Sequence, residues 1–178
     1  DVFFKDLTTA QEHNLSISGG NKTINYYISG NYMKEDGLFS FEDVNLDGMS
    51  RMNVAGKVEA RPKDWLTVSY SSRFIKEDYF EPSALSYAGD NEGRNILWYF
   101  GQYLWPVAPL YDPNGILFND LALRFSRGGT RSTSNISSIH QFDFVLEPVK
   151  GWRIVGDANY RYRSYYNTVV DKTVWQTC

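Results

Sequence analysis

The sequence predicts an all-β protein, an antiparallel meander of about six long strands. Apolar and polar residues alternate with a period of two along much of the chain, as in strands that have one apolar face. Aromatic residues make up 16% of the 178 residues and 14 glycines are scattered among them, which suits β-structure with wet surfaces. We expect strands near residues 12–19, 24–34, 50–61, 65–77, 134–147 and 152–164.

The connections between these runs alternate in length. The segments GGNKT, RPKD and EPVKG are short, whereas residues 34–49 and 78–133 are long. Short turns at one end of an antiparallel sheet and long loops at the other are typical of outer-membrane β-barrels, whose short turns face the periplasm. Runs of ten or more residues also suit a tilted crossing of a bilayer, which needs about 9–11 residues. The sequence therefore predicts a partial transmembrane β-barrel with short periplasmic turns and long extracellular loops.

Aromatic residues lie where the two membrane interfaces of such a barrel would be. Trp65 and Trp152 each follow a short turn, and Tyr32, Phe74 and Tyr162 are placed for the opposite girdle. The polar face would then point into the lumen, where its charges would contact a plug or each other, or steer anionic solutes. The residues that we expect to face the lumen are Arg51, Lys57, Glu59, Arg61, Arg73, Arg153, Asp157, Arg161 and Arg163.

Two other classes of protein share parts of this pattern. A soluble or surface-attached β-sandwich that binds glycans also has alternating strands, but it explains neither the length of the runs nor the alternation of short and long connections. A β-rich glycoside hydrolase needs a pair of carboxylates, which any sequence with 21 acidic residues can supply. The barrel is the interpretation that accounts for most of the pattern.

Charge and cysteine content exclude several functions. The formal net charge of −3 argues against non-specific nucleic-acid binding, which needs a basic face. The single cysteine, Cys178, permits neither an internal disulfide nor a cysteine-rich zinc site. No run of 18 apolar residues indicates a spanning helix, although barrel strands leave no such signal.

Three stretches follow one another along the chain: HNLSISGGNKTINYYISGNYMKEDGLF, then MSRMNVAGKVEARPKDWLTVSYSSRF, and later WPVAPLYDPNG. The first two resemble the early barrel of SusC/RagA-type TonB-linked outer-membrane proteins, and the third resembles the extracellular loop that follows it in that family. The resemblance implies a 22-stranded barrel with an N-terminal plug, energised by TonB, in the outer membrane of a Gram-negative, Bacteroidetes-like bacterium. It further implies contact with membrane lipid, a SusD-like surface lipoprotein as partner, and an oligosaccharide or peptide as cargo.

The chain departs from that family in several respects. Six strands are fewer than the roughly eight with which outer-membrane barrels start, so we expect a fragment of a larger barrel. The sequence contains no plug, TonB box, signal peptide or closing C-terminal strand that we can identify. The expected contribution of this chain is therefore barrel wall and loops, without bond chemistry.

The long loop is rich in aromatic residues within residues 95–120. Flat rings beside carboxylates and amides suit stacking on sugars or anchoring to a protein, and they equally suit a small core within the loop. Asp112 also belongs to a DPNG turn, whose geometry explains the residue without a ligand. The candidates for contact with substrate or partner are Trp98, Tyr99, Tyr103, Trp105, Tyr111 and Asp112.

The segment EDVNLDGMSR resembles the start of a calcium-binding EF-hand loop. Counted from Asp43, the twelfth position must be a bidentate glutamate, but it is Val54 in a predicted strand. We expect a polar turn, with a calcium site of another geometry, built from Asp43, Asn45, Asp47 and Glu42, as the alternative. His13 and His140 stand in no metal or hydrolase motif, so we expect no enzymatic activity and no cofactor.

Overall fold

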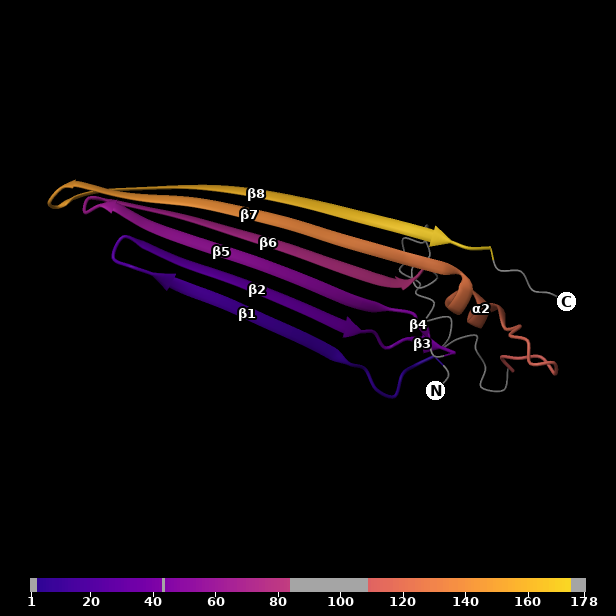
Figure 1. Cartoon of the computed structure of the whole chain (residues 1–178). Coiled ribbons are helices and arrows are strands. Elements are labelled where there is room, and N and C mark those ends of the chain that lie inside the picture. Colours follow the sequence, from indigo (N-terminus) through magenta and orange to yellow (C-terminus); the bar gives the residue numbers. More distant parts are fainter. Residues whose placement is uncertain (1–2, 43, 84–108, 174–178) are drawn as a thin grey trace.

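The computed structural model describes residues 3–42, 44–83 and 109–173. It confirms the all-β prediction: six antiparallel strands form one meandering sheet in which neighbours in sequence are neighbours in space (Figure 1). The strands, in sheet order, are β1 (Ala10–Gly20), β2 (Ile24–Asp36), β5 (Gly48–Lys63), β6 (Leu66–Pro82), β7 (Gly129–Val149) and β8 (Trp152–Asp171). Within the described residues β1 and β8 do not pair with each other, so the sheet is open.

The strands are longer than predicted, both beside the long loop and at the end of β8, which runs to Asp171 rather than to residue 164. β6 runs to Pro82 and β7 begins at Gly129, so the predicted loop 78–133 is too long at both ends. Its ends pair as strands, and the Ser134 hydroxyl donates to the Asp78 carboxylate at 2.6 Å. In β7 residues 130–133 are polar on both faces, and in β6 the aromatic neighbours Tyr79 and Phe80 fall on opposite faces, so no apolar alternation marks these ends in the sequence.

Three short elements gather at the end of the sheet opposite the short turns (Figure 1). Strands β3 (Ser40–Phe41) and β4 (Val44–Asn45) form a small hairpin between β2 and β5. Helix α2 (Asp120–Arg127) precedes β7, and the Asn119 side chain caps it by accepting from the Ala122 N–H at 3.2 Å. We did not predict this eight-residue helix within the long loop.

The buried core of the described residues lies at this end and not on the sheet. The Phe125 side chain is 1% exposed and packs edge-on against Phe3 and Phe39, with ring centroids 5.6 and 5.4 Å apart. The Phe3 ring stacks on Phe41 at 5.3 Å. The loop core comprises Phe3, Phe41, Leu117, Ala122, Leu123 and Phe125.

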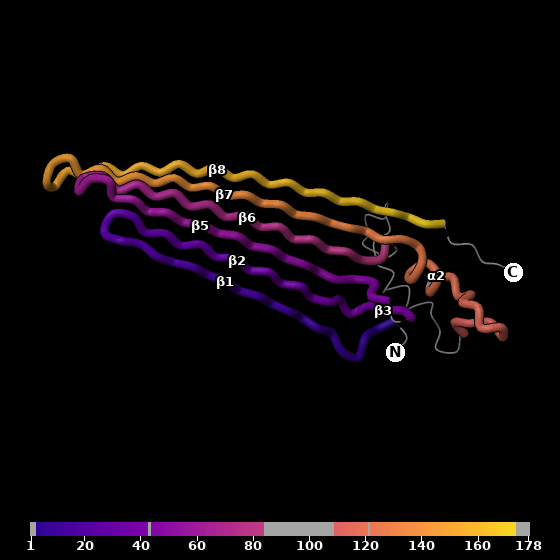
Figure 2. The backbone as a smooth tube through the Cα atoms, viewed as in Figure 1, coloured from indigo at the N-terminus to yellow at the C-terminus, as the bar shows by residue number. Residues whose placement is uncertain are grey.

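The three short turns do not lie at the same position along the strand direction, because each extends farther than the one before it. One row of paired residues crosses all six strands, and beyond it lie four residues at the β1–β2 turn (21–24), nine at β5–β6 (60–68) and thirteen at β7–β8 (144–156). The turns therefore advance by about 15 Å over about 19 Å of sheet width, a slope of roughly 40°. Figure 2 shows this stepping, with the β7–β8 turn reaching farthest. The row consists of Gly20, Asn25, Glu59, Ser69, Asp143 and Asp157.

Replacing Phe125 by alanine should loosen the loop core without disturbing the sheet. Truncating a fully buried phenylalanine costs about 3–5 kcal/mol, and this ring joins α2 to the N-terminal segment and to Phe39. Amide hydrogen exchange should accelerate at residues 109–128 and remain slow in β5. Ile116→Ala, at a side chain that is 47% exposed, is the control and should change little. Unchanged protection in the Phe125 variant would contradict this packing.

Candidate functional site

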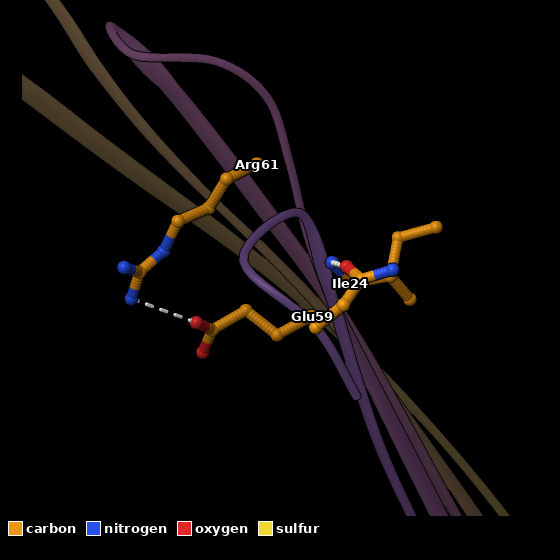
Figure 3. A network of polar contacts seen from close by, with 4 residues as sticks. Ile24, Glu59 and Arg61 are labelled. Carbon is orange, nitrogen blue, oxygen red and sulfur yellow. Dashed lines mark hydrogen bonds and ion pairs between the residues drawn. The ribbon is translucent and has the colours of Figure 1, made fainter. Parts of the chain in front are cut away.

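The register of the strands sorts their side chains into two faces of opposite character. Directly paired residues share a face in an antiparallel sheet, so the pairings assign each side chain. Figure 3 shows the result near the short turns, where the Ile24 side chain extends away from the side that holds Glu59 and Arg61. The apolar face carries Leu15, Ile17, Ile24, Tyr26, Ile28, Met52, Val54, Val58, Leu66, Val68, Tyr70, Phe74, Phe142, Phe144, Leu146, Ile154, Tyr160 and Tyr162.

No described residue covers the apolar face. Ile28 is 52% exposed, Val54 44% and Phe142 44%, although each lies in the interior of the sheet. Monomeric soluble proteins rarely expose a continuous apolar patch of more than a few hundred Å². A face that spans six strands far exceeds this, so it needs an apolar environment that the described residues do not supply.

Aromatic residues border the apolar face at both ends. Trp152 lies on this face beside the β7–β8 turn and is 67% exposed, whereas Trp65, 46% exposed, belongs to the β5–β6 turn outside the strand pairing. Tyr32 and Tyr162 stand on this face toward the loops. Beyond them the same face becomes polar in a row of paired residues. Ile24 to Tyr32 and Trp152 to Tyr162 span about 27 and 34 Å along their strands, or about 20–26 Å in height at a 40° tilt. The polar row is Lys34, Ser50, Asp78, Ser134 and Tyr166.

The nine charged residues that we predicted to face a lumen all lie on the other face, here called the polar face. Two of the nine pair with carboxylates: Arg51 Nε is 3.3 Å from Glu77, and Arg61 is 3.0 Å from Glu59, itself one of the nine (Figure 3). These side chains are partly exposed, so each pair is worth at most about 1 kcal/mol. The polar face is a wet surface rather than a second core.

An amide network crosses three strands of the polar face. Asn31 pairs with Asn14 on one side and with Asn53 on the other, and the three side chains are linked by hydrogen bonds. Asn31 Nδ2 also donates to the Glu12 carboxylate at 2.7 Å, and Asn14 Nδ2 donates to it at 3.2 Å. The network fixes polar groups at one height on the face.

Of the loop candidates, the structure describes only Tyr111 and Asp112. The Asp112 carboxylate accepts from the backbone N–H groups of Asn114 and Ile116, both at 2.8 Å, and these bonds, the one from Ile116 first, hold its pKa below the usual value. Asp112 therefore builds the turn. Trp98, Tyr99, Tyr103 and Trp105 lie outside the described residues.

Tyr111 belongs to a contact between loops. Its hydroxyl donates to Glu42 at 3.3 Å, and Arg127 approaches the same carboxylate at 3.6 Å. Partial burial, together with the negative charge of Glu42, raises the pKa of Tyr111. These interactions tie the β3–β4 turn to the DPNG turn and to α2, so Tyr111 has a structural partner.

The segment that resembles an EF-hand forms a turn. The Asp47 carboxylate accepts from the backbone N–H groups of Phe39 at 2.8 Å and Leu38 at 3.2 Å, while Val54 lies in β5. Asp43 lies outside the described residues. Among the residues that are described, no three His, Cys, Asp or Glu side chains lie close enough to hold a metal ion.

One polar cluster on the apolar face escaped the sequence analysis. His140 contacts the Tyr70 hydroxyl through Nδ1 and the Ser138 hydroxyl through Nε2, both at 2.8 Å, and Ser72 lies 3.2 Å from Nδ1. The rings of Tyr70 and Tyr160 stack on the imidazole from the neighbouring strands. The sequence does contain a signal for this cluster: His140 alternates in phase with Phe142 and Phe144 and is therefore a polar residue on the predicted apolar face.

No family model matches the chain, and no curated protein shows significant similarity to it. In the described part of the chain, no helix is both long and apolar enough to span a membrane. Function must therefore be inferred from the two faces of the sheet and from the resemblance of the strand sequences.

The DPNG turn should loosen in acid. Because the Asp112 pKa is lowered in the folded turn, its contribution is present above the ordinary carboxyl pKa of about 3.9 and is lost as the pH falls through the lowered value. Hydrogen-exchange protection of residues 114–116, corrected for intrinsic rates, should fall below about pH 4. Asp112→Asn should abolish this pH dependence, and an identical response in that variant would refute the role of the carboxylate.

Proposed function

We propose that this chain forms part of the wall of an outer-membrane β-barrel, in a transporter of the SusC/RagA type. The observation that carries the proposal is the uncovered apolar face, bounded by aromatic residues at both ends and backed by a charged face. Its side chains contact lipid, and the polar face lines the aqueous interior. The chain contributes wall and loops and carries out no bond chemistry.

The energetics of the apolar face favour lipid over a second sheet of the same chain. Burying a large apolar side chain is worth about 1.5–3 kcal/mol, so a face of eighteen such residues is worth tens of kcal/mol. A β-sandwich gains this energy by packing two sheets together. Here all six long strands join one sheet. The only other sheet among the described residues is the hairpin of β3 and β4, whose strands have two residues each. A bilayer supplies the missing apolar environment for the whole face.

The geometry of the sheet matches a crossing of the outer membrane. Strands of transmembrane barrels tilt by about 35–45° relative to the barrel axis. If the turns between such tilted strands all lie at one depth in the membrane, each turn is displaced along the strand direction relative to the turn before it. The slope of the turns, roughly 40°, lies within this range of tilts and so supports the proposal. The height between the aromatic borders, about 20–26 Å, agrees with the apolar band of about 25 Å.

The type of transporter is inferred from the resemblance. The motif HNLSISGG occupies β1, the YYISGNY stretch β2, the RMN stretch β5 and the WLTVSYSSRF stretch the start of β6, so the order of the motifs is also their order across the sheet. On this proposal TonB energises import through a plug, and a SusD-like lipoprotein meets the loops beyond β3, β4 and α2. The cargo is a glycan or a peptide.

Site-directed spin labels on adjacent residues test which face meets lipid. Val54 and Ala55 are neighbours in β5 on opposite faces, and Ile28 and Ser29 are the equivalent pair in β2. In the full-length protein in liposomes, labels at 28 and 54 should collide with dissolved oxygen, which concentrates in the bilayer. Labels at 29 and 55 should collide with a water-soluble nickel chelate.

Each neighbour is the control for the other, because the two sites share a strand and a height. If the nickel chelate reached both members of each pair equally, the wall would not be embedded in lipid and the proposal would fail. A soluble, monodisperse protein in detergent-free buffer would have the same consequence.

A further inference from the structure

Charges on the polar face are layered in transverse rows of paired residues. The row nearest the β1–β2 turn contains Glu59, Asp143 and Asp157, of which Asp143 and Asp157 are paired directly. Eight residues further along β5, toward the loops, a mixed row contains Arg51 and Glu77. Between these two levels lie three rows that contain no carboxylate.

Four cations stand in the three intermediate rows. This set, here called the basic belt, consists of Lys57 in the first row, Arg73 and Arg161 in the second, and Arg163 in the third. Most of the other positions in these rows carry hydroxyl or amide groups, including the amide network. Only the register between strands brings Lys57, Arg73 and the pair Arg161 and Arg163 together, because these lie on three strands and are far apart in sequence.

The positive charge of the belt is not neutralised within the sheet. Lys57 and Arg73 lie on interior strands whose neighbours on both sides are described, and neither forms an ion pair with a described residue. Both side chains are exposed. Arg51 and Arg61, on the same face, do have carboxylate partners. The basic belt therefore exposes positive charge, without carboxylate partners in the described sheet, on the polar face.

We infer, on the basis of the proposed function, that the basic belt binds a solute that carries several carboxylates. Lys57 and Arg73 are diagonal neighbours about 7–8 Å apart at the backbone, and Arg73 and Arg161 stand two strands or about 10 Å apart. One carboxylate cannot reach all four cations, whereas an acidic oligomer can. Acidic oligosaccharides and acidic peptides share this chemistry.

The surroundings of the belt favour an exchangeable solute over a permanently docked protein segment. A stable protein interface has an apolar centre, but these rows offer mainly hydroxyl and amide groups in contact with water. The acidic row toward the turns repels an anion that moves past the belt. The basic belt and the acidic row beside it therefore favour binding of the anion at one height in the lumen, as an intermediate binding site on a transport path would.

Binding measurements on the full-length protein in detergent test the inference. The probes are oligogalacturonate and oligoglutamate, each compared with a neutral counterpart, the methyl-esterified oligogalacturonate or oligoglutamine. At low salt we expect calorimetry to show binding of at least one acidic probe and not of its neutral form. K57Q/R73Q should weaken that binding at least tenfold, and K57R/R73K should retain it. The two acidic probes distinguish a saccharide from a peptide.

The control K63Q/K150Q removes two exposed cations beside the short turns, outside the belt, and should change the affinity less than twofold. Equal binding of acidic and neutral probes, or wild-type affinity in K57Q/R73Q, would overturn the inference. So would a K57Q/R73Q protein that binds normally but melts at lower temperature, because the cations would then pair with a protein segment. Spin labels at 54 and 55 in the same preparation separate the two failures: with the lipid pattern intact, only the belt is wrong.

Discussion

Lateral backbone pairing between strands is the constraint on which the rest of this structure depends. It satisfies the backbone N–H and C=O groups of the interior strands without help from side chains, which leaves both faces of the sheet free for different solvents. Because side chains alternate, a slip of one residue in any pairing would move charges such as Arg73 to the apolar side. The register therefore protects the separation of the two faces.

The His140 cluster shows what the apolar face tolerates. Both ring nitrogens have hydroxyl partners from the same sheet, and two tyrosine rings flank the imidazole. A polar group in hydrocarbon is costly only when its hydrogen bonds are unmet. The cluster therefore remains compatible with lipid contact, while the unpaired cations Lys57 and Arg73 are confined to the polar face.

Alternation predicted the strands well where one face is apolar and poorly elsewhere. The residues of β5 and β8 were assigned to their faces from the sequence, because Val58 and Tyr162 each lie between two charged residues. The extensions of β6 and β7, residues 78–82 and 129–133, were missed because no apolar alternation marks them. Helix α2 is held by tertiary contacts of Phe125 that no local pattern reveals. The basic belt depends on pairing between distant strands, which a single sequence does not encode visibly.

Fluorescence quenching of single tryptophans by brominated lipids tests the central claim, that the apolar face meets the bilayer between two aromatic borders. Variants of the full-length protein would retain only Trp65, only Trp152, or only a tryptophan introduced by Ile28→Trp. We expect shallow bromines, near the headgroup, to quench Trp65 and Trp152 best, and deep bromines to quench position 28 best. If aqueous iodide quenched all three and no brominated lipid quenched any, the sheet would not face lipid.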